Sequence, residues 1–112
     1  MKSEQMSRRR SELNRLMTSN DDFFVEFGAL DDQAYAAGAI DKKHKELMGL
    51  AISVVTRCDE CILYHIGGCL EANATRDEII EAIKIGVIGG GSITYPNARF
   101  AFEMLKELKV IE

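Results

Sequence analysis

Four residues of the chain are of the types, and at the spacings, that thiol redox chemistry requires. They form the pattern Glu46-x11-Cys58-x2-Cys61-x3-His65. Two thiols one helical turn apart can provide an attacking and a resolving sulfur. An imidazole can remove a thiol proton, and a carboxylate can orient the imidazole. The pattern therefore predicts a thiol-dependent redox site.

Local helical geometry supports the central part of this pattern. Cys61 and His65 are four residues apart, so on a helix they lie on the same face, and His65 can take the Cys61 proton. The positive end of the helix dipole also favours a thiolate at this position. We predict that Cys61 is the nucleophile and that Cys58, nearer the preceding corner and more exposed, is the resolving thiol.

Three further residues lie close to the thiols in sequence. Asp59 and Glu60 are carboxylates, which oppose thiolate formation and raise thiol pKa values. Tyr64 precedes His65 and could line a pocket or simply pack as an aromatic side chain. Glu60 and Tyr64 are therefore candidate pocket residues.

Glu46 is harder to place from local geometry. It lies 12 residues before Cys58, roughly 18 Å along a straight helix, and at the edge of its helix's apolar stripe. A corner near residues 57–60 would fold the next helix back and could bring Glu46 to His65. Otherwise Glu46 would be a solvated glutamate, paired with Lys42 or Lys43.

The elements that must hold these residues are all predicted to be helices. The chain has a single proline, and no stretch alternates between apolar and polar residues. We expect a compact bundle of about six helices. Capping and periodicity place seven helical segments, two of them short, at about 4–18, 22–28 with a break near Gly28, 31–37, 41–56, 60–74, 75–88 and 92–108.

The apolar patterns predict which faces are buried. A stripe of Phe23, Phe24 and Phe27 is expected in the core. The last helix should face inward through Ala98, Ala101, Phe102, Leu105 and Leu108. The all-apolar stretch 85–88 must be buried, either in the core or between subunits.

Composition limits the classes of protein that the chain can represent. Its 112 residues, 46% of them apolar, fit a single domain with N-terminal helices in residues 1–40 and a core in residues 41–108. The net charge of −4 and the lack of a concentrated basic surface argue against nucleic-acid binding. No apolar run approaches the ~20 residues that span a bilayer. With no secretory signal, we expect the reducing cytoplasm, where a Cys-x-x-Cys pair is catalytic or metal-binding.

Residues 41–108 resemble the carboxymuconolactone decarboxylase and alkylhydroperoxidase D-like family, in its Cys-x-x-Cys redox branch. The four-residue pattern carries the resemblance, together with a helix that ends in glycines and a last helix rich in alanine. The resemblance implies a thiol-dependent hydroperoxide reductase. By position, Cys61 attacks the peroxide, Cys58 resolves the intermediate, and His65 with Glu46 forms a proton relay.

The resemblance also implies the partners of the reaction. It implies an external dithiol or dithiol-protein reductant, a trimeric or hexameric assembly, and no metal or organic cofactor. One departure is Glu60, which occupies a position where the alkylhydroperoxidase D proteins usually have a histidine. This change removes a potential positive charge beside Cys61 and adds a negative one.

Three alternatives use the same residues differently. The thiols could serve a disulfide reductase without significant peroxidase activity, or be inert in an interaction module. Cys58, Cys61, His65 and Cys69 could instead bind zinc in a structural module. The zinc site is disfavoured because Cys61 and Cys69 would be roughly 12 Å apart along one helix.

Overall fold

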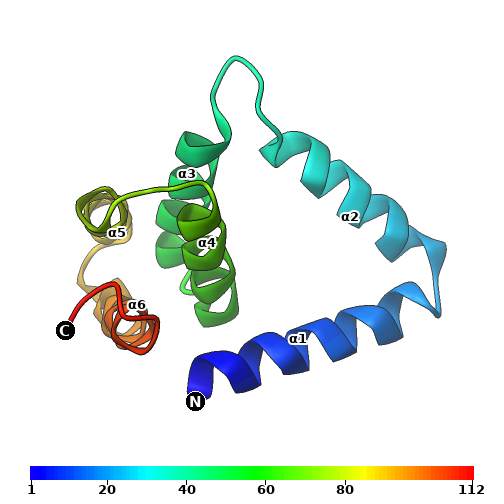
Figure 1. The fold of residues 1–112 in the computed structure, drawn as a ribbon, viewed down its shortest axis with the longest axis horizontal. Coiled ribbons are helices and arrows are strands. Elements are labelled where there is room, and N and C mark those ends of the chain that lie inside the picture. Colours follow the sequence, from blue (N-terminus) through cyan, green and yellow to red (C-terminus); the bar gives the residue numbers. More distant parts are fainter.

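The computed structural model describes all 112 residues, and every regular element in it is a helix (Figure 1). The predicted all-α fold of six helices is confirmed. The α-helices, with one short 3-10 helix η1 (Ser92–Thr94), are α1 (Lys2–Thr18), α2 (Asp22–Tyr35), α3 (Lys42–Val55), α4 (Asp59–Glu71), α5 (Arg76–Gly90) and α6 (Tyr95–Glu107).

Side-chain caps set the starts of three helices. Asp21 and Asp41 cap α2 and α3 by accepting hydrogen bonds from backbone N–H groups. Thr75 and Glu78 form the predicted capping box at α5. The predicted break near Gly28 is wrong, because α2 continues through it to Tyr35. A lone glycine costs a helix about 1 kcal/mol, which its neighbours can offset.

The hydrophobic core lies within the bundle α3–α6. α3 packs against both α4 and α5, and α6 packs against α4. Gly86 of α5 lies so close to Val54 and to the Ala51 carbonyl that a Cβ atom would clash with both. The fully buried larger side chains of this core are Leu50, Val54, Ile62, Ile66, Ile79, Met104 and Leu105.

The first two helices form an arm that extends away from the bundle and returns to it at the start of α3 (Figure 1). We call residues 2–35 the N-terminal arm. α2 contains no buried residue, and Ser3 is the only buried residue of α1. No helix of the chain combines the length and the apolar character needed to cross a membrane.

The prediction of a buried face is wrong for α2 and partly confirmed for α6. Phe23 and Phe27 are each 62% exposed and Phe24 is also exposed, because the arm leaves α2 without a partner along most of its length. In the last helix, Ala101 and Leu105 are fully buried as predicted. Phe102 and Leu108 are exposed, however, and Phe100 and Met104 are buried.

The apolar end of α5 is only partly buried. Gly86 packs against α3, but Ile85 and Ile88 are 66% and 84% exposed. Burial within the bundle is therefore excluded for these two side chains. Burial between subunits, the other option predicted for this stretch, stays a prediction.

Candidate active site

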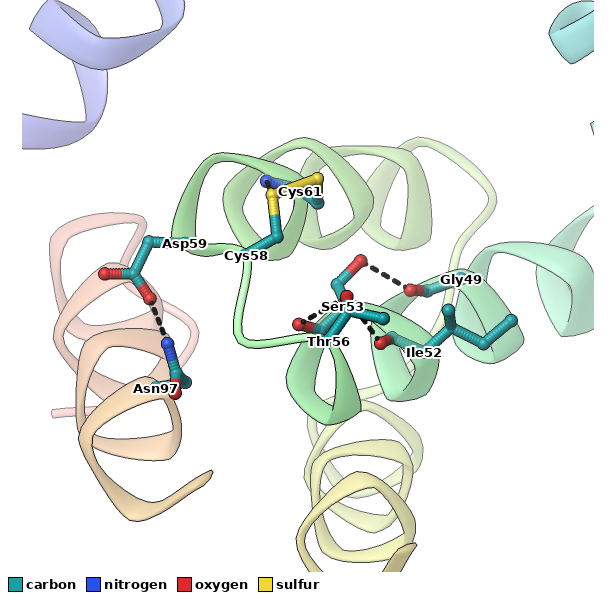
Figure 2. The surroundings of a disulfide bond; sticks show 8 residues. All are labelled: Gly49, Ile52, Ser53, Thr56, Cys58, Asp59, Cys61 and Asn97. Carbon is teal, nitrogen blue, oxygen red and sulfur yellow. Dashed lines mark hydrogen bonds between the residues drawn. A yellow bond between two sulfur atoms is a disulfide. The ribbon is translucent and has the colours of Figure 1, made fainter. Parts of the chain in front are cut away.

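The connection between α3 and α4 is a tight corner, as predicted from the sequence. Arg57 has a φ of 57°, in the left-handed region that few non-glycine residues adopt. The Cys58 amide then donates to the Ser53 carbonyl, and Cys58 becomes the N-cap of α4. The side chains of Ser53 and Thr56 donate to carbonyls of the last turns of α3 (Figure 2). The corner sends α4 back along α3.

Cys58 and Cys61 form a disulfide at the start of α4 (Figure 2). Their Cα atoms are 5.2 Å apart, within the ordinary range for a disulfide. The Cys61 amide also donates to the Cys58 Sγ atom at 3.2 Å. The prediction that the two sulfurs meet within one turn is confirmed.

The relative exposure of the two cysteines is the reverse of the prediction. Cys61 is exposed, whereas Cys58 is only partly exposed. The reason is the N-cap geometry, which turns the Cys58 side chain over the first turn of α4. Greater exposure of Cys61 suits a thiol that must meet a substrate.

His65 and Glu46 are in direct contact. The imidazole Nδ1 lies 2.9 Å from Glu46 Oε1, and the two residues are 9% and 3% exposed. Because an ionised carboxylate can only accept, Nδ1 carries the hydrogen in this contact, and in a neutral imidazole Nε2 then keeps its lone pair. The fold-back of α4 along α3 brings the two residues together, although 19 positions separate them in the sequence.

A second partner neutralises the Glu46 carboxylate. Lys42, one turn earlier on α3, donates to Glu46 Oε2 at 2.6 Å. Burial alone raises the pKa of Glu46, but the hydrogen bonds from Lys42 and His65 outweigh burial and lower the pKa below its usual value. The predicted pairing with Lys42 is present, but Glu46 is buried rather than solvated.

Two glycines provide the space for this pair. A Cβ atom at Gly68 would overlap Glu46 Oε1, and a Cβ at Gly49 would lie 2.6 Å from His65 Cε1 and 2.7 Å from the Tyr35 hydroxyl. Gly67, by contrast, has nothing within 4 Å of its missing side chain. The Gly67-Gly68 pair was visible in the sequence, but only the packing of α3 on α4 shows that Gly68 is the glycine that matters.

Two aromatic rings pack against His65. The Tyr35 ring, from the end of α2, and the Tyr64 ring lie with centroids 5.1 and 5.2 Å from the imidazole. The Arg10 guanidinium lies 4.0 Å from the Tyr64 centroid. Burial is the largest cause of a raised pKa for Tyr35, so its hydroxyl stays protonated at neutral pH. Sequence spacing did not identify Tyr35 or Arg10 as site residues, because each reaches the site from the N-terminal arm, far from the cysteines in sequence.

A cavity of about 850 Å³ lies between the arm and the corner. Its lining includes both cysteines, His65 and the two predicted pocket residues Glu60 and Tyr64. The arm contributes Arg10, Asn14, Met17, Thr18, Phe24, Phe27, Gly28 and Asp31. Glu46 does not line this cavity. It faces a second one of about 420 Å³, which Lys42 and Gly68 also line. The His65–Glu46 pair thus connects the cavity of the cysteines with a different opening.

The remaining polar and sulfur groups have ordinary structural partners. Asp59 accepts a hydrogen bond from Asn97 of α6 at 2.8 Å (Figure 2). Cys69 is buried in the core, and burial raises the pKa of its thiol to about 12, so it is inert at neutral pH. No group of three or more His, Cys, Asp and Glu side chains is arranged to hold a metal ion, so the zinc alternative has no ligand set.

Comparison with known proteins places this fold and site in one class. The model of the carboxymuconolactone decarboxylase family matches residues 21–107. The chain belongs to this family. The matched region begins with α2, so half of the N-terminal arm lies within it.

Individual relatives agree with this assignment. "Uncharacterized protein 4 in cox locus" of Paracoccus denitrificans is 35% identical over 97 residues, which are 87% of this chain and 85% of that one. A solved structure from Thermotoga maritima superposes with a TM-score of 0.87 and 41% identity, over 94% of this chain and 90% of that one. It is a carboxymuconolactone decarboxylase family protein for which a part in the antioxidative response has been suggested.

A named enzyme is also similar over part of its length. Alkyl hydroperoxide reductase AhpD of Mycobacteroides abscessus is 36% identical over 52 residues, which are 46% of this chain but only 30% of that protein. The family and these relatives are consistent with an enzyme of the oxidoreductase or decarboxylase type.

Proposed function

We propose that the protein is a thiol-dependent hydroperoxide reductase in which Cys61 attacks the peroxide. The observation that carries the proposal is the arrangement in one cavity of an exposed cysteine, its disulfide partner and a buried histidine. Glu46 fixes the Nδ1 atom of that histidine. This arrangement supplies a nucleophile, a resolving thiol and an oriented base without any further group.

The proposed cycle begins with the reduced pair. His65 Nε2 takes the Cys61 proton, and the thiolate sulfur attacks one peroxide oxygen. The O–O bond breaks as an S–O bond forms, and the departing alkoxide takes the proton from His65 and leaves as an alcohol. Cys61 is then a sulfenic acid.

Cys58 completes the oxidative half of the cycle. Its sulfur displaces the sulfenic hydroxyl, which leaves as water, and the disulfide seen in the structure forms. An external dithiol or dithiol protein then supplies two electrons by thiol–disulfide exchange and restores both thiols. Such a reductant is consistent with the cytoplasmic location predicted from the sequence.

Hydroperoxide consumption by the purified protein tests the proposal. Cumene hydroperoxide would be followed with dihydrolipoamide as the electron donor. We expect turnover in the wild type, none in Cys61→Ser, and slowing of about 10²-fold or more in His65→Ala, as is typical for loss of a general base. Turnover by Cys61→Ser equal to that of the wild type would exclude the mechanism.

The Cys58→Ser variant provides the matched control for the order of events. It should consume one equivalent of hydroperoxide and stop, with a sulfenic acid on Cys61 that mass spectrometry of a dimedone adduct detects. A wild type that exchanges with small disulfides but leaves hydroperoxide unchanged would instead indicate the disulfide reductase.

We also propose that the chain works as a trimer or hexamer. The exposed phenylalanines of α2 and the exposed Ile85 and Ile88 of α5 support this proposal, because apolar area of this extent is seldom left in water. Light scattering after size exclusion should give three or six chains per particle. Phe23→Ser/Phe27→Ser should lower that number, and a wild-type monomer at micromolar concentration would refute the assembly.

A further inference from the structure

Lys42 is the one cation in direct contact with the buried Glu46–His65 pair. Its Nζ atom lies 2.6 Å from Glu46 Oε2, while Oε1 is occupied by His65. The ammonium also lies 5.6 Å from the Tyr35 ring centroid, and Lys42 lines the second cavity, which does not include the cysteines. Lys42 thus holds the carboxylate from the side that is remote from the cysteines.

The positive charge of Lys42 affects which atoms of the Glu46–His65 pair carry hydrogen. Glu46 is 3% exposed, and a buried carboxylate is stable only when a positive charge or a proton balances it. With Lys42 present, the ammonium balances the carboxylate and the imidazole can stay neutral. Without Lys42, the pair must take up a proton, either on Glu46 or on His65.

Whether the proton binds to His65 or to Glu46, the effect on His65 Nε2 is the same. If His65 becomes an imidazolium, both ring nitrogens carry hydrogen. If Glu46 is protonated, it donates to Nδ1, and the ring hydrogen moves to Nε2. In either state Nε2 no longer has a free lone pair for the Cys61 proton.

We propose that Lys42 is a positioning residue for catalysis, which acts as the counter-charge of Glu46 and thereby keeps Nε2 of His65 free of hydrogen. Only the effect of Lys42 on the rate of reaction with hydroperoxide rests on the proposed function. The state of the imidazole ring is a property of the folded chain and can be measured by itself.

The other charged groups near the pair cannot replace Lys42. Tyr35 and Tyr64 contact the imidazole through their aromatic rings, and Cys61 is held in the disulfide. The charged side chains that line the cavity of the cysteines are Arg10, Asp31, Arg57, Asp59 and Glu60, and none of them is hydrogen-bonded to Glu46 or His65.

The chain provides a matched control at the adjacent position. Lys43, the next residue of the same helix, forms a more exposed ion pair with Glu78 of α5 at 2.9 Å. Lys43→Met removes the same charge and one ion pair, but leaves Glu46 untouched. Lys42→Arg keeps the charge, whereas Lys42→Met removes it with little change in the length of the side chain.

The experiment measures ¹⁵N chemical shifts of the imidazole rings at pH 7 in the oxidised, full-length protein, in which no thiol proton is available to His65. The chain has two histidines, and the exposed His44, bonded to Asp41, serves as an internal reference. We expect Nε2 of His65 to lack hydrogen in the wild type, Lys42→Arg and Lys43→Met, and to carry it in Lys42→Met.

The kinetic measurement uses the reduced proteins and cumene hydroperoxide in single turnover. Lys42→Met should react more slowly than the wild type by about 10²-fold, the lower end of what a general base contributes, and Lys42→Arg should recover most of the rate. Two results would overturn the inference. One is an Nε2 atom without hydrogen in Lys42→Met, and the other is an Nε2 atom that carries hydrogen in Lys43→Met. A wild type that reduces no hydroperoxide would refute the proposed function and leave the NMR result to decide the role of Lys42.

Discussion

The N-terminal arm and the bundle α3–α6 use their apolar residues in opposite ways. In the bundle, side chains such as Leu50 and Ile66 are fully buried and account for the core. In the arm, Phe23 and Phe27 are mostly exposed, and α2 buries no residue within the chain. The bundle therefore supplies the stability of the fold, whereas the arm covers the cavity of the cysteines and leaves an apolar surface exposed.

The two regions meet at His65, which shows what the arm does for the site. The bundle provides both cysteines, His65 and Glu46, and the arm adds Tyr35 against the imidazole. The arm thus shapes the surroundings of the reactive groups without supplying a member of the relay. The following predictions test this division, from the largest expected effect to the smallest.

The largest contrast should appear in stability. Ile66→Ala removes a fully buried side chain, so it should lower the free energy of unfolding by about 2–5 kcal/mol. Phe27→Ala removes a mostly exposed ring and should change the stability of the monomer by less than about 1 kcal/mol. Urea unfolding at low protein concentration measures both values. Equal losses would show that the arm belongs to the folding core.

A smaller effect is expected within the bundle at the paired glycines. A methyl group at Gly68 would overlap the Glu46 carboxylate, so Gly68→Ala should displace it from His65 and slow hydroperoxide reduction by about tenfold, within the range for an impaired general base. Gly67→Ala meets no neighbouring atom and should stabilise α4 by about 0.4–1 kcal/mol with unchanged activity. If the two variants had equal rates, the position of Glu46 would be unimportant.

The pH dependence of stability should report the charge on Glu46. Its pKa is lowered in the folded chain relative to the usual 4.5, so the ionised carboxylate stabilises the fold above that value. This contribution should be lost as the pH falls through the lowered pKa. Glu46→Gln, which cannot ionise, should be less stable than the wild type at pH 7. The difference in free energy of unfolding between the two proteins, measured by urea titration, should narrow below about pH 4.5. If this difference were the same at every pH, packing alone would hold Glu46.

The smallest effect is expected where the arm touches the site through a cation. Arg10 of α1 stacks on Tyr64, and such partly exposed contacts contribute about 0.5–1 kcal/mol. Arg10→Gln should therefore increase hydrogen exchange in α1 and leave exchange in α4 and the rate of Cys61 alkylation unchanged. Increased exchange in α4 would indicate that the bundle depends on the arm.

Local rules were sufficient for the parts of the molecule whose interactions are close in sequence. The caps at Asp21, Asp41 and Thr75 and the contact of the two cysteines involve residues two or three positions apart. A residue pattern identifies such features, because the backbone geometry of one helical turn fixes the distances. The same rules did not reveal that α2 continues through Gly28, since its neighbours offset the cost of a single glycine.

The sequence by itself determined the all-α fold, the corner at Arg57 and the contact of Cys58 with Cys61, which are proposed to carry the thiol chemistry. Only the tertiary structure decided that Glu46 meets His65 directly, that Lys42 and Gly68 hold Glu46 there, and that Tyr35 covers the imidazole. Each of these contacts except that of Lys42 joins residues from different helices. Such contacts depend on how the helices cross, and no local periodicity encodes that crossing.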